Sequence, residues 1–481
     1  MARTIGIDVG TTSVKAAIID ADGTVLDTFS EGYATLRPRD GHVEQDPRDW
    51  MRLVNAALAA FAGHDVTAIG LTSQVNTHVF TDAAGTALAP AILWQDGRAA
   101  EEAAGLDAQV SPAQKQDWWG APMPIDASNV LSRMAWMARH RPEIWDQTRY
   151  VMLPKDYCLF HLTGAAISDP LSNIGLVGPD LAHVSGALDM VPGAADRILP
   201  LAQPCTQIGA VQSGPFRGTP LICGTMDAWA GLVGTGGARD GTMMYLSGTS
   251  EILGISSRKV VPTPGAIVFA DCDGVRLHAA PTQAGGDAAA WFAGTQGLTL
   301  SDMADQVTAP RSAATPLFLP QLEGERAPLW DADLRGAFLG LSRQTDRTDL
   351  ARAVYEGVAF SARMALEVLE ISADVTGARI RCGGGGFRSV PWAQIRADIL
   401  GKELHVLAAG EPGTLGAASM AAIGAGIHDS YAEANAALAR FDRVYTPDDQ
   451  AHARYNTLYE LYREAIEIHA DLGKRLIAAN R

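Results

Sequence analysis

The 481-residue sequence predicts an α/β protein with two lobes, and two features carry that prediction. Apolar runs of strand length alternate along the chain with amphipathic stretches of helical period, which is the pattern of α/β folds. Residues 4–20 and 243–254 also repeat one local pattern: an apolar strand, a tight turn of Gly, Thr and Ser, and a second apolar strand. The chain length agrees with two or three domains. We therefore expect one such hairpin in each of two lobes.

The turns of both hairpins have the composition of a phosphate-binding site. Such a turn exposes several backbone N–H groups and hydroxyls in one concavity, which suits a phosphate. Either stretch alone is also compatible with an ordinary hairpin, but the pairing favours a duplicated phosphate clamp and a nucleotide held between two lobes. The turn residues are Gly10, Thr11, Thr12 and Ser13 in the first hairpin, and Gly248 and Thr249 within 247–250 in the second.

The other elements follow from apolar spacing and from breaks in it. We expect strands over residues 5–9, 15–20, 68–72, 79–81, 221–223, 242–246, 265–269 and 380–382. We expect helices over residues 131–140, 349–369, 391–400 and 451–479. Thr348 or Asp349 can cap the start of the second of these helices. The glycine-rich stretch 231–241 lies between the two hairpins, so we place the domains at 1–238 and 239–481.

The composition excludes several classes of partner. The net charge is −16 and no basic run appears, which argues against nucleic acid and anionic membranes as partners. The five cysteines are scattered and odd in number, which indicates reduced thiols in a cytosolic protein. A strand begins at once without a signal peptide, and no apolar run reaches membrane-spanning length. We therefore expect a cytoplasmic protein.

Two aspartates lie next to features that suit phosphoryl transfer. Asp8 ends the first strand just before the first turn, where a carboxylate can hold Mg²⁺ or cap the turn. Lys15 either adds a charge near the phosphates or lies in solvent. Asp227 follows a strand and a Gly-Thr turn and opens an Ala/Gly-rich helix. Transfer to an alcohol needs a carboxylate that takes the hydroxyl proton, although an Asp at a helix start is also a common N-cap.

Two more clusters favour a flat ring and a polyhydroxylated ligand. Residues 383–386 are four glycines between a strand and a helix, and they let a ring or phosphate approach the backbone closely. They form neither the dinucleotide fingerprint nor a Walker A motif. Residues 70–78 and 94–98 follow strands and offer amides, an indole and carboxylates, which suit the edges and face of a sugar. The alternative is polar loop residues with a half-buried Trp94.

Nearly the whole chain resembles the FGGY family of carbohydrate kinases, and among them the xylulokinases. Residues 336–356 fit the family's C-terminal signature completely. Further segments that are similar to xylulokinases are residues 5–11, 44–47, 91–98, 153–157, 324–326 and 384–389. The resemblance implies two lobes of the actin-like, ribonuclease-H-like fold, with ATP and sugar in the cleft. It also implies a cytoplasmic ATP-dependent kinase with Mg²⁺ that converts a ketopentose, first of all D-xylulose to D-xylulose 5-phosphate, and a homodimer is the family's common state.

The resemblance also assigns roles to residues. Asp227 matches the catalytic base and Asp8 the Mg²⁺-associated carboxylate. Residues 10–13 and 247–250 match the phosphate turns. The remaining matches are sugar contacts for Gln74, Val75, Asn76 and Trp94, and an adenosine-side loop formed by Gly384, Gly385 and Gly386 with Gly285 and Gly286 nearby.

Three departures from the xylulokinase pattern affect the choice of sugar. Residues 73–77 read Ser-Gln-Val-Asn-Thr where xylulokinases typically carry Gly-Gln-Met-His-Gly. Ala228 stands where an Asn usually follows the catalytic Asp, and Arg133 takes the Lys position of the N-terminal signature. Ribulose, erythrulose or erythritol, and gluconate are therefore alternative substrates. An actin-like assembly protein is the alternative from another class, but it needs neither Asp227 nor the polar set around Trp94.

Overall fold

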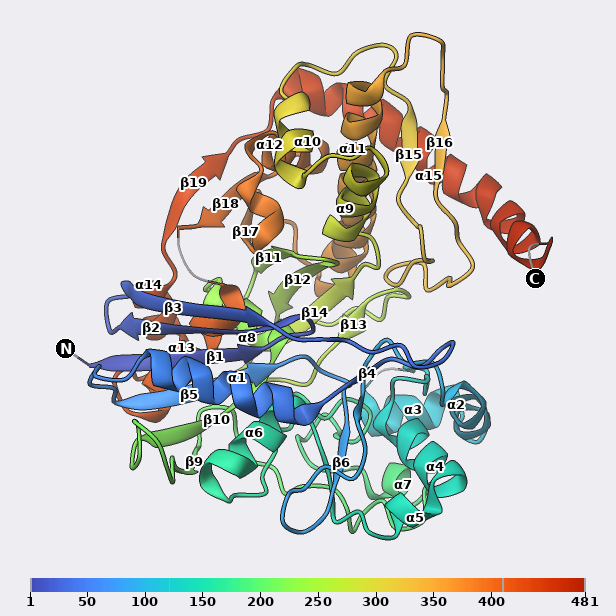
Figure 1. Ribbon diagram of the computed structural model, residues 1–481. Helices are drawn as coiled ribbons and strands as arrows, with labels where there is room; N and C mark the ends of the chain where they lie inside the picture. The colour runs from blue at the N-terminus through green and yellow to red at the C-terminus, as the bar shows by residue number, and fades with distance from the viewer. Residues whose placement is uncertain (1, 121, 409–410, 480–481) are drawn as a thin grey trace. The chain divides into compact units, whose positions relative to one another are not determined.

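The structure is a computed structural model that describes residues 2–120, 122–408 and 411–479 (Figure 1). Its contacts divide the chain into two compact units. Unit 1 comprises residues 1–236, 270–272 and 409–440, and unit 2 comprises residues 237–269, 273–408 and 441–481. The predicted domains 1–238 and 239–481 differ from these units mainly at 409–440. Residues 412–424 form a helix that lies against the first sheet, which places this part of the chain in unit 1.

Unit 1 is built on a six-stranded sheet with the order β3-β2-β1-β5-β10-β9. The central strands β1, β5 and β10 are parallel, whereas β1–β2, β2–β3 and β9–β10 are antiparallel. The strands are β1 (Arg3–Val9), β2 (Ser13–Asp20), β3 (Val25–Gly32), β5 (Ala68–Ser73), β9 (Gln207–Ala210) and β10 (Pro220–Met226).

The two faces of this sheet are covered in different ways. Ile5, Ile7 and Val9 of β1 pack in one apolar cluster with residues of α1 (Pro47–Ala60) and α6 (Pro154–Thr163). On the other face α13 (Pro412–Gly424) lies on β1 and β5, and α8 (Asp227–Gly234) packs beside it. A Cβ on Gly6 would lie 1.9 Å from Thr414 O, so only glycine permits this approach.

The rest of unit 1 is mainly helical and has its own apolar core. Phe80, Ile92, Leu131 and Met134 lie in that core. Its elements are β4 (Glu44–Gln45), β6 (Val79–Thr81), β7 (Ala91–Ile92), α2 (Ala100–Asp107), α3 (Pro112–Trp119), α4 (Val130–His140), α5 (Pro142–Trp145), β8 (Tyr150–Met152) and α7 (Ser185–Leu188). The last helix of unit 1, α14 (Tyr431–Leu438), packs instead against α13 and α8.

Unit 2 is built on a seven-stranded sheet with the order β13-β14-β12-β11-β17-β18-β19. As in unit 1, the first strand of a hairpin pairs antiparallel with its partner (β11–β12) and parallel with a later strand (β11–β17). The strands are β11 (Thr242–Ser247), β12 (Glu251–Ser257), β13 (Ile267–Val268), β14 (Arg276–Pro281), β17 (Arg379–Gly383), β18 (Glu403–Leu407) and β19 (Phe441–Tyr445).

The apolar core of unit 2 is formed by side chains of several helices, long and short. Val354, Phe360 and Tyr459 lie in one cluster, which joins α11 to α15. The elements are α9 (Gly286–Thr295), α10 (Leu300–Gln306), β15 (Leu317–Leu319), β16 (Ala337–Leu339), α11 (Arg347–Ala373), the 3₁₀ helix η1 (Gly385–Arg388), α12 (Val390–Leu400) and α15 (Asp449–Ala479).

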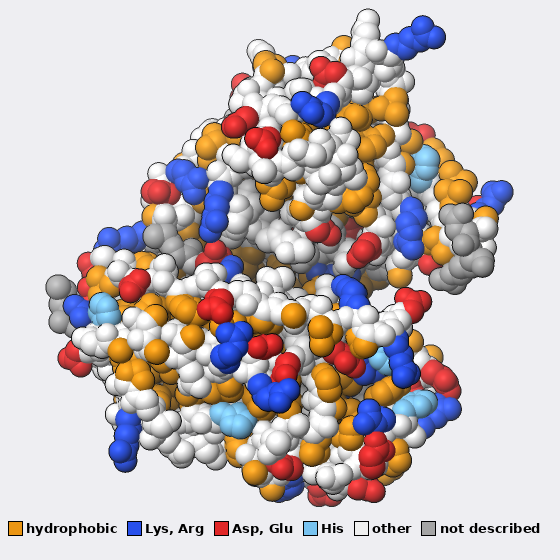
Figure 2. Space-filling view, in the orientation of Figure 1, with side chains coloured by type: hydrophobic (Ala, Val, Ile, Leu, Met, Phe, Trp, Pro, Cys, Tyr) orange, Lys and Arg blue, Asp and Glu red, His pale blue; other side chains and the backbone are white. Residues whose placement is uncertain are grey.

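The predicted strands and helices all occur, with two corrections. Residues 265–269 form only the short strand Ile267–Val268. The predicted cap of the long helix is wrong, because Asp346 is the N-cap and accepts a 2.9 Å hydrogen bond from Asp349 N. Within the described residues, no helix is long and apolar enough to cross a membrane. Acidic and basic side chains are interspersed on the face shown in Figure 2.

Candidate active site

The first predicted phosphate turn connects β1 to β2 and is anchored by its carbonyl groups. Gly10 N donates to Ser13 O at 3.0 Å, and Tyr33 N donates to Thr12 O at 3.3 Å. Gln45 Nε2 donates to Thr11 O at 2.7 Å. Because N–H and C=O point in opposite directions across a trans peptide, holding the carbonyls on one side turns the following N–H groups to the other. The carbonyl groups of residues 11–13 are therefore all hydrogen-bonded, and the binding of phosphate by the turn's N–H groups stays a prediction.

Asp8 stands at the end of β1, beside this turn. Among the described residues, its buried Oδ1 has no hydrogen-bond partner. Burial, and next the neighbouring Asp227 carboxylate, raise the pKa of Asp8 to about 7, while Lys15 acts in the opposite direction. Lys15 Nζ lies 3.1 Å from Glu411 Oε2, so this lysine has a carboxylate partner in unit 1. The site thus holds a carboxylate that a cation would stabilise.

Helix α13 approaches Asp8 closely. A Cβ on Gly413, in the first turn of this helix, would lie 2.4 Å from Asp8 Oδ2. A side chain at this position would therefore occupy the space beside the carboxylate. In the part of the chain that the structure describes, no group of three or more His, Cys, Asp or Glu side chains is placed to hold a metal ion.

Asp227 is the first residue of α8, and a bulge in β10 positions it. The β10–β5 register shifts between Ile222 and Thr225, at Gly224, which has φ +67°. A Cβ on Gly224 would lie 1.6 Å from Leu71 O. The N-cap alternative is wrong, because Met226 occupies that position; Asp227 Oδ1 accepts a 2.8 Å hydrogen bond from Ala228 N. Val9 and Met226 both pair with Ser73, so the ends of β1 and β10 that carry Asp8 and Asp227 lie on either side of β5. The half-buried Asp227 carboxylate is also the second cause of the raised pKa of Asp8.

A buried polar network supports the strand end that leads to Asp227. Thr225 Oγ1 donates to Asp169 Oδ1 at 2.7 Å. Lys155 Nζ lies 2.9 Å from Asp169 Oδ2 and 2.6 Å from Asp156 Oδ1. Thr72 Oγ1 donates to Thr225 O at 2.6 Å and ties β10 to β5. The Lys-Asp pair within 153–157 was the sequence signal for this network, but no pattern predicted Asp169 or Thr225 as members.

Gln74 and Trp94 lie close to the first phosphate turn. Gln74 is buried, and its Nε2 donates to Gln45 Oε1 at 3.0 Å, which places it in the network that anchors Thr11. Trp94 Nε1 donates to Thr11 Oγ1 at 3.1 Å, and Trp94 N donates to Thr77 Oγ1 at 3.3 Å. The structure therefore joins both predicted sugar loops to the turn, Trp94 directly and Gln74 through Gln45. The sequence indicates Gln45 only as part of the segment 44–47.

Val75 and Asn76 are half-buried at the tip of the same loop. Asn76 has a left-handed φ of +52°, and its Nδ2 donates to Ser128 Oγ at 3.3 Å. Arg133 donates to Asn76 O. The roles of these residues in sugar binding stay predictions.

In unit 2 the second turn and the predicted Gly285–Gly286 pair pack together. Gly286 N donates to Gly248 O at 2.9 Å, and Asp287 N donates to Thr249 O at 3.0 Å. A Cβ on Gly285 would lie 2.6 Å from Thr249 O. The start of α9 thus rests directly on the turn.

The glycine-rich loop lies against the same turn. Gly384 has φ +95°, and a Cβ on it would lie 2.4 Å from Ser247 O. A Cβ on Gly386 would lie 2.0 Å from Ser247 Oγ, whereas one on Gly385 would meet no described atom within 4 Å. The buried Arg396 links the two elements by donating to Gly386 O at 2.9 Å and to Ser247 Oγ at 2.8 Å. Sequence reasoning missed Arg396 and its ion pair with Glu251, at 2.5 Å.

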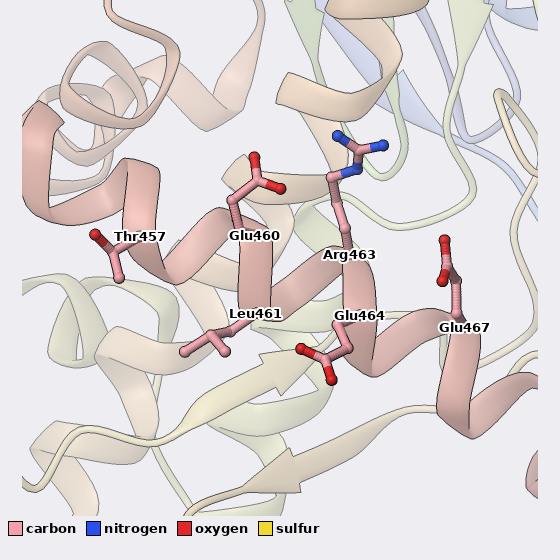
Figure 3. A pocket seen from close by; sticks show the side chains of 6 residues that line it. All are labelled: Thr457, Glu460, Leu461, Arg463, Glu464 and Glu467. Carbon is pink, nitrogen blue, oxygen red and sulfur yellow. The ribbon is translucent and has the colours of Figure 1, made fainter.

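One surface pocket lies elsewhere in unit 2, along α15. Glutamates dominate its lining and none of the predicted site residues contributes, so its charge does not suit a phosphate. Figure 3 shows the residues that line it: Thr457, Glu460, Leu461, Arg463, Glu464 and Glu467.

Comparisons with known proteins agree on one family. The model of the FGGY family of carbohydrate kinases, N-terminal domain, matches residues 3–178, and the C-terminal domain model matches residues 243–425. The xylulose kinase of Escherichia coli K12 is 31% identical over 479 residues, which are 95% of this chain and 97% of that protein.

Solved structures extend the same similarity to the fold. The ligand-bound xylulose kinase of Lactobacillus acidophilus gives a TM-score of 0.88 at 25% identity, over 98% of this chain and 99% of that one. The gluconate kinase of the same organism gives 0.87 at 25% identity, over 98% of both chains. The predicted two-lobed, actin-like α/β fold is confirmed by these neighbours.

Proposed function

Because the chain belongs to the FGGY family of carbohydrate kinases, we propose that it transfers the γ-phosphate of ATP to a ketopentose hydroxyl. D-xylulose, giving D-xylulose 5-phosphate, is the first candidate, since xylulose kinases match the chain over almost its whole length. The observation that carries the proposal is the pair of carboxylates, Asp8 and Asp227, beside the first phosphate turn. Family membership argues against an assembly protein.

Asp227 is the proposed general base. Its carboxylate takes the proton of the sugar hydroxyl while the hydroxyl oxygen forms a bond to the γ-phosphorus. The bond from that phosphorus to the β,γ-bridging oxygen breaks, and ADP leaves. The bulge at Gly224 and the buried network at Thr225 support this role, because they fix the backbone from which Asp227 projects.

Asp8 is the residue proposed to hold Mg²⁺, directly or through water. Its unpartnered oxygen and raised pKa fit a cation ligand, since a nearby positive charge would stabilise the carboxylate. When bound, Mg²⁺ neutralises charge on the β- and γ-phosphates. Thr11 and its neighbours, and in unit 2 Gly248 and Thr249, are proposed to bind the phosphates through backbone N–H groups. We assign the adenosine side to the glycine-rich loop, Gly384, Gly385 and Gly386, together with the pair Gly285 and Gly286.

The sugar side depends on residues that differ from the xylulokinase pattern. We assign sugar contacts to Trp94, Val75 and Asn76, which are half-buried, and a supporting position to Gln74, which is buried in the network behind them. Ribulose, erythrulose or erythritol, and gluconate remain alternative substrates, the last because a gluconate kinase is among the structural neighbours. A cytoplasmic homodimer is the proposed state of the enzyme.

A coupled ADP-release assay tests the proposal. The purified chain is given Mg²⁺–ATP and each of a panel of ketoses, polyols and gluconate, and ³¹P NMR identifies the product. We expect sugar-dependent ADP release with D-xylulose or a related ketose, and none from Asp227→Ala. Release that no member of the panel stimulates would refute the assignment.

A further inference from the structure

A buried guanidinium in unit 1 is bound by backbone carbonyls instead of a carboxylate. Arg133 of α4 is fully buried. It donates to Asn76 O and Leu93 O, and to Ile92 O at 3.0 Å. No described carboxylate lies within ion-pair distance of it. Burying a charge in this way is costly unless hydrogen bonds replace its water, so the position demands an explanation beyond packing.

His78 completes this set of acceptors. Arg133 Nη1 lies 2.9 Å from His78 Nδ1. Burial, and next the Arg133 charge, hold the pKa of His78 well below its usual range, so its ring is neutral. Because a guanidinium can only donate, Nδ1 is the accepting atom in this contact. Burial lowers the pKa of Arg133 to about 9, with Asp96 and Asp126 opposing that shift, so the guanidinium is charged at neutral pH.

The acceptors belong to the two loops that carry the proposed sugar contacts. Asn76 and His78 lie in the 74–78 loop, whereas Ile92 and Leu93 immediately precede Trp94. One planar guanidinium therefore contacts both segments through hydrogen bonds. The loops also meet directly, through the His78–Ile92 bridge and the hydrogen bond from Trp94 N to Thr77 Oγ1.

We propose that Arg133 is a positioning residue that sets the distance between Asn76 and Trp94, and so selects among sugars. This inference rests on the proposed kinase function. The guanidinium suits the task because its rigid fork of donors bonds several acceptors at once, which a lysine ammonium cannot do with the same geometry. A displacement of about 1 Å in a binding loop can cost about 100-fold in rate, so small errors in loop spacing matter.

Arg133→Lys tests the proposal, with Arg352→Lys as the matched control. Arg352 is a buried arginine of unit 2 that also donates to backbone carbonyls, those of Val307 and Ala309, although unlike Arg133 it has a carboxylate partner, Glu356, at 3.6 Å. We expect Arg133→Lys to lower kcat/KM for the preferred sugar about tenfold or more and to change the order of sugars, with KM for ATP within about twofold. The control should lose thermal stability and keep the order of sugars.

Thr77→Val provides a second variant that leaves the buried charge in place. It removes the hydroxyl that accepts from Trp94 N, so it should shift the same sugar preferences in a folded protein. An unchanged order of sugars in the folded variants, or the same change in Arg352→Lys, would overturn the proposal. Failure of the wild-type chain to release ADP with any sugar would instead refute the proposed function.

Discussion

Replacing Asp8 by Asn should stabilise the protein in a pH-dependent way. The pKa of Asp8 is raised from 3.8 to about 7 by burial and by Asp227, which corresponds to a cost of about 4 kcal/mol for the ionised form. Between these pH values the folded state keeps a proton that the unfolded state releases. The free energy of unfolding therefore falls as pH rises through this window.

The size of this stabilisation depends on how much of the range between the two pKa values of Asp8, 3.8 and about 7, the measurement crosses. Asp8→Asn should raise the free energy of unfolding relative to wild type, and this gain should be about 2–3 kcal/mol larger at pH 8 than at pH 5. Urea titrations at the two pH values, without nucleotide or divalent ions, measure the difference. Any effect of the Asn side chain on stability that does not depend on pH is the same at both values and cancels in their difference.

Repeating the measurement in a protein that carries Asp227→Asn tests whether the Asp227 charge contributes to the raised pKa of Asp8. Asp227→Asn removes the like charge that raises the pKa of Asp8, so the pH-dependent gain from Asp8→Asn should shrink in that background. A gain of equal size at pH 5 and pH 8 would show that Asp8 ionises normally, and it would remove the electrostatic argument for a cation at this site.

Three further predictions concern activity. Asp227→Ala should lower kcat by roughly 10²–10⁴ with normal circular dichroism and ATP affinity, and a mutant with most of its activity would contradict the general-base role. Thr249→Val should raise KM for ATP more than KM for sugar, whereas Thr11→Val should raise both, because Thr11 also accepts the hydrogen bond of Trp94. Steady-state kinetics measure both constants, and the same changes in the two variants would argue against this difference. Exchanging Val75-Asn76 for Met-His should move kcat/KM toward D-xylulose by about tenfold to a hundredfold at constant KM for ATP, whereas an unchanged ranking in the sugar panel would place specificity elsewhere.

Much of the architecture could be predicted because it depends on local patterns. Apolar runs and glycine-rich turns specify hairpins whatever surrounds them, so both hairpins and the strands beside them were found from the sequence. The cap of the long helix was missed because Asp346 precedes two polar residues that also favour helix starts.

The supporting residues could not be found in the same way. Arg396 and Asp169 are charged side chains, which most often lie on the surface, and nothing in their neighbours in sequence marks them as buried. Arg133 was noted only because it takes a Lys position of the family's N-terminal signature, and that match did not indicate that it is buried. Their partners come from loops and strands far along the chain, and only the folded structure brings those acceptors together. The sequence therefore predicts which residues carry the chemistry of the site, but it does not predict the buried residues that hold them in place.

The fit of α13 against the first sheet has a consequence for how the chain is made. Gly6 and Gly70 leave a groove on β1 and β5 whose bottom is backbone, and the helix that fills it is encoded after residue 411. The strands emerge early in synthesis, but the helix that covers them emerges only when most of the chain exists. Contacts so distant in sequence form slowly, because the intervening loop must be closed first. During translation one face of the first sheet therefore stays uncovered until α13 has been synthesised, and over that time it is exposed to association with other chains.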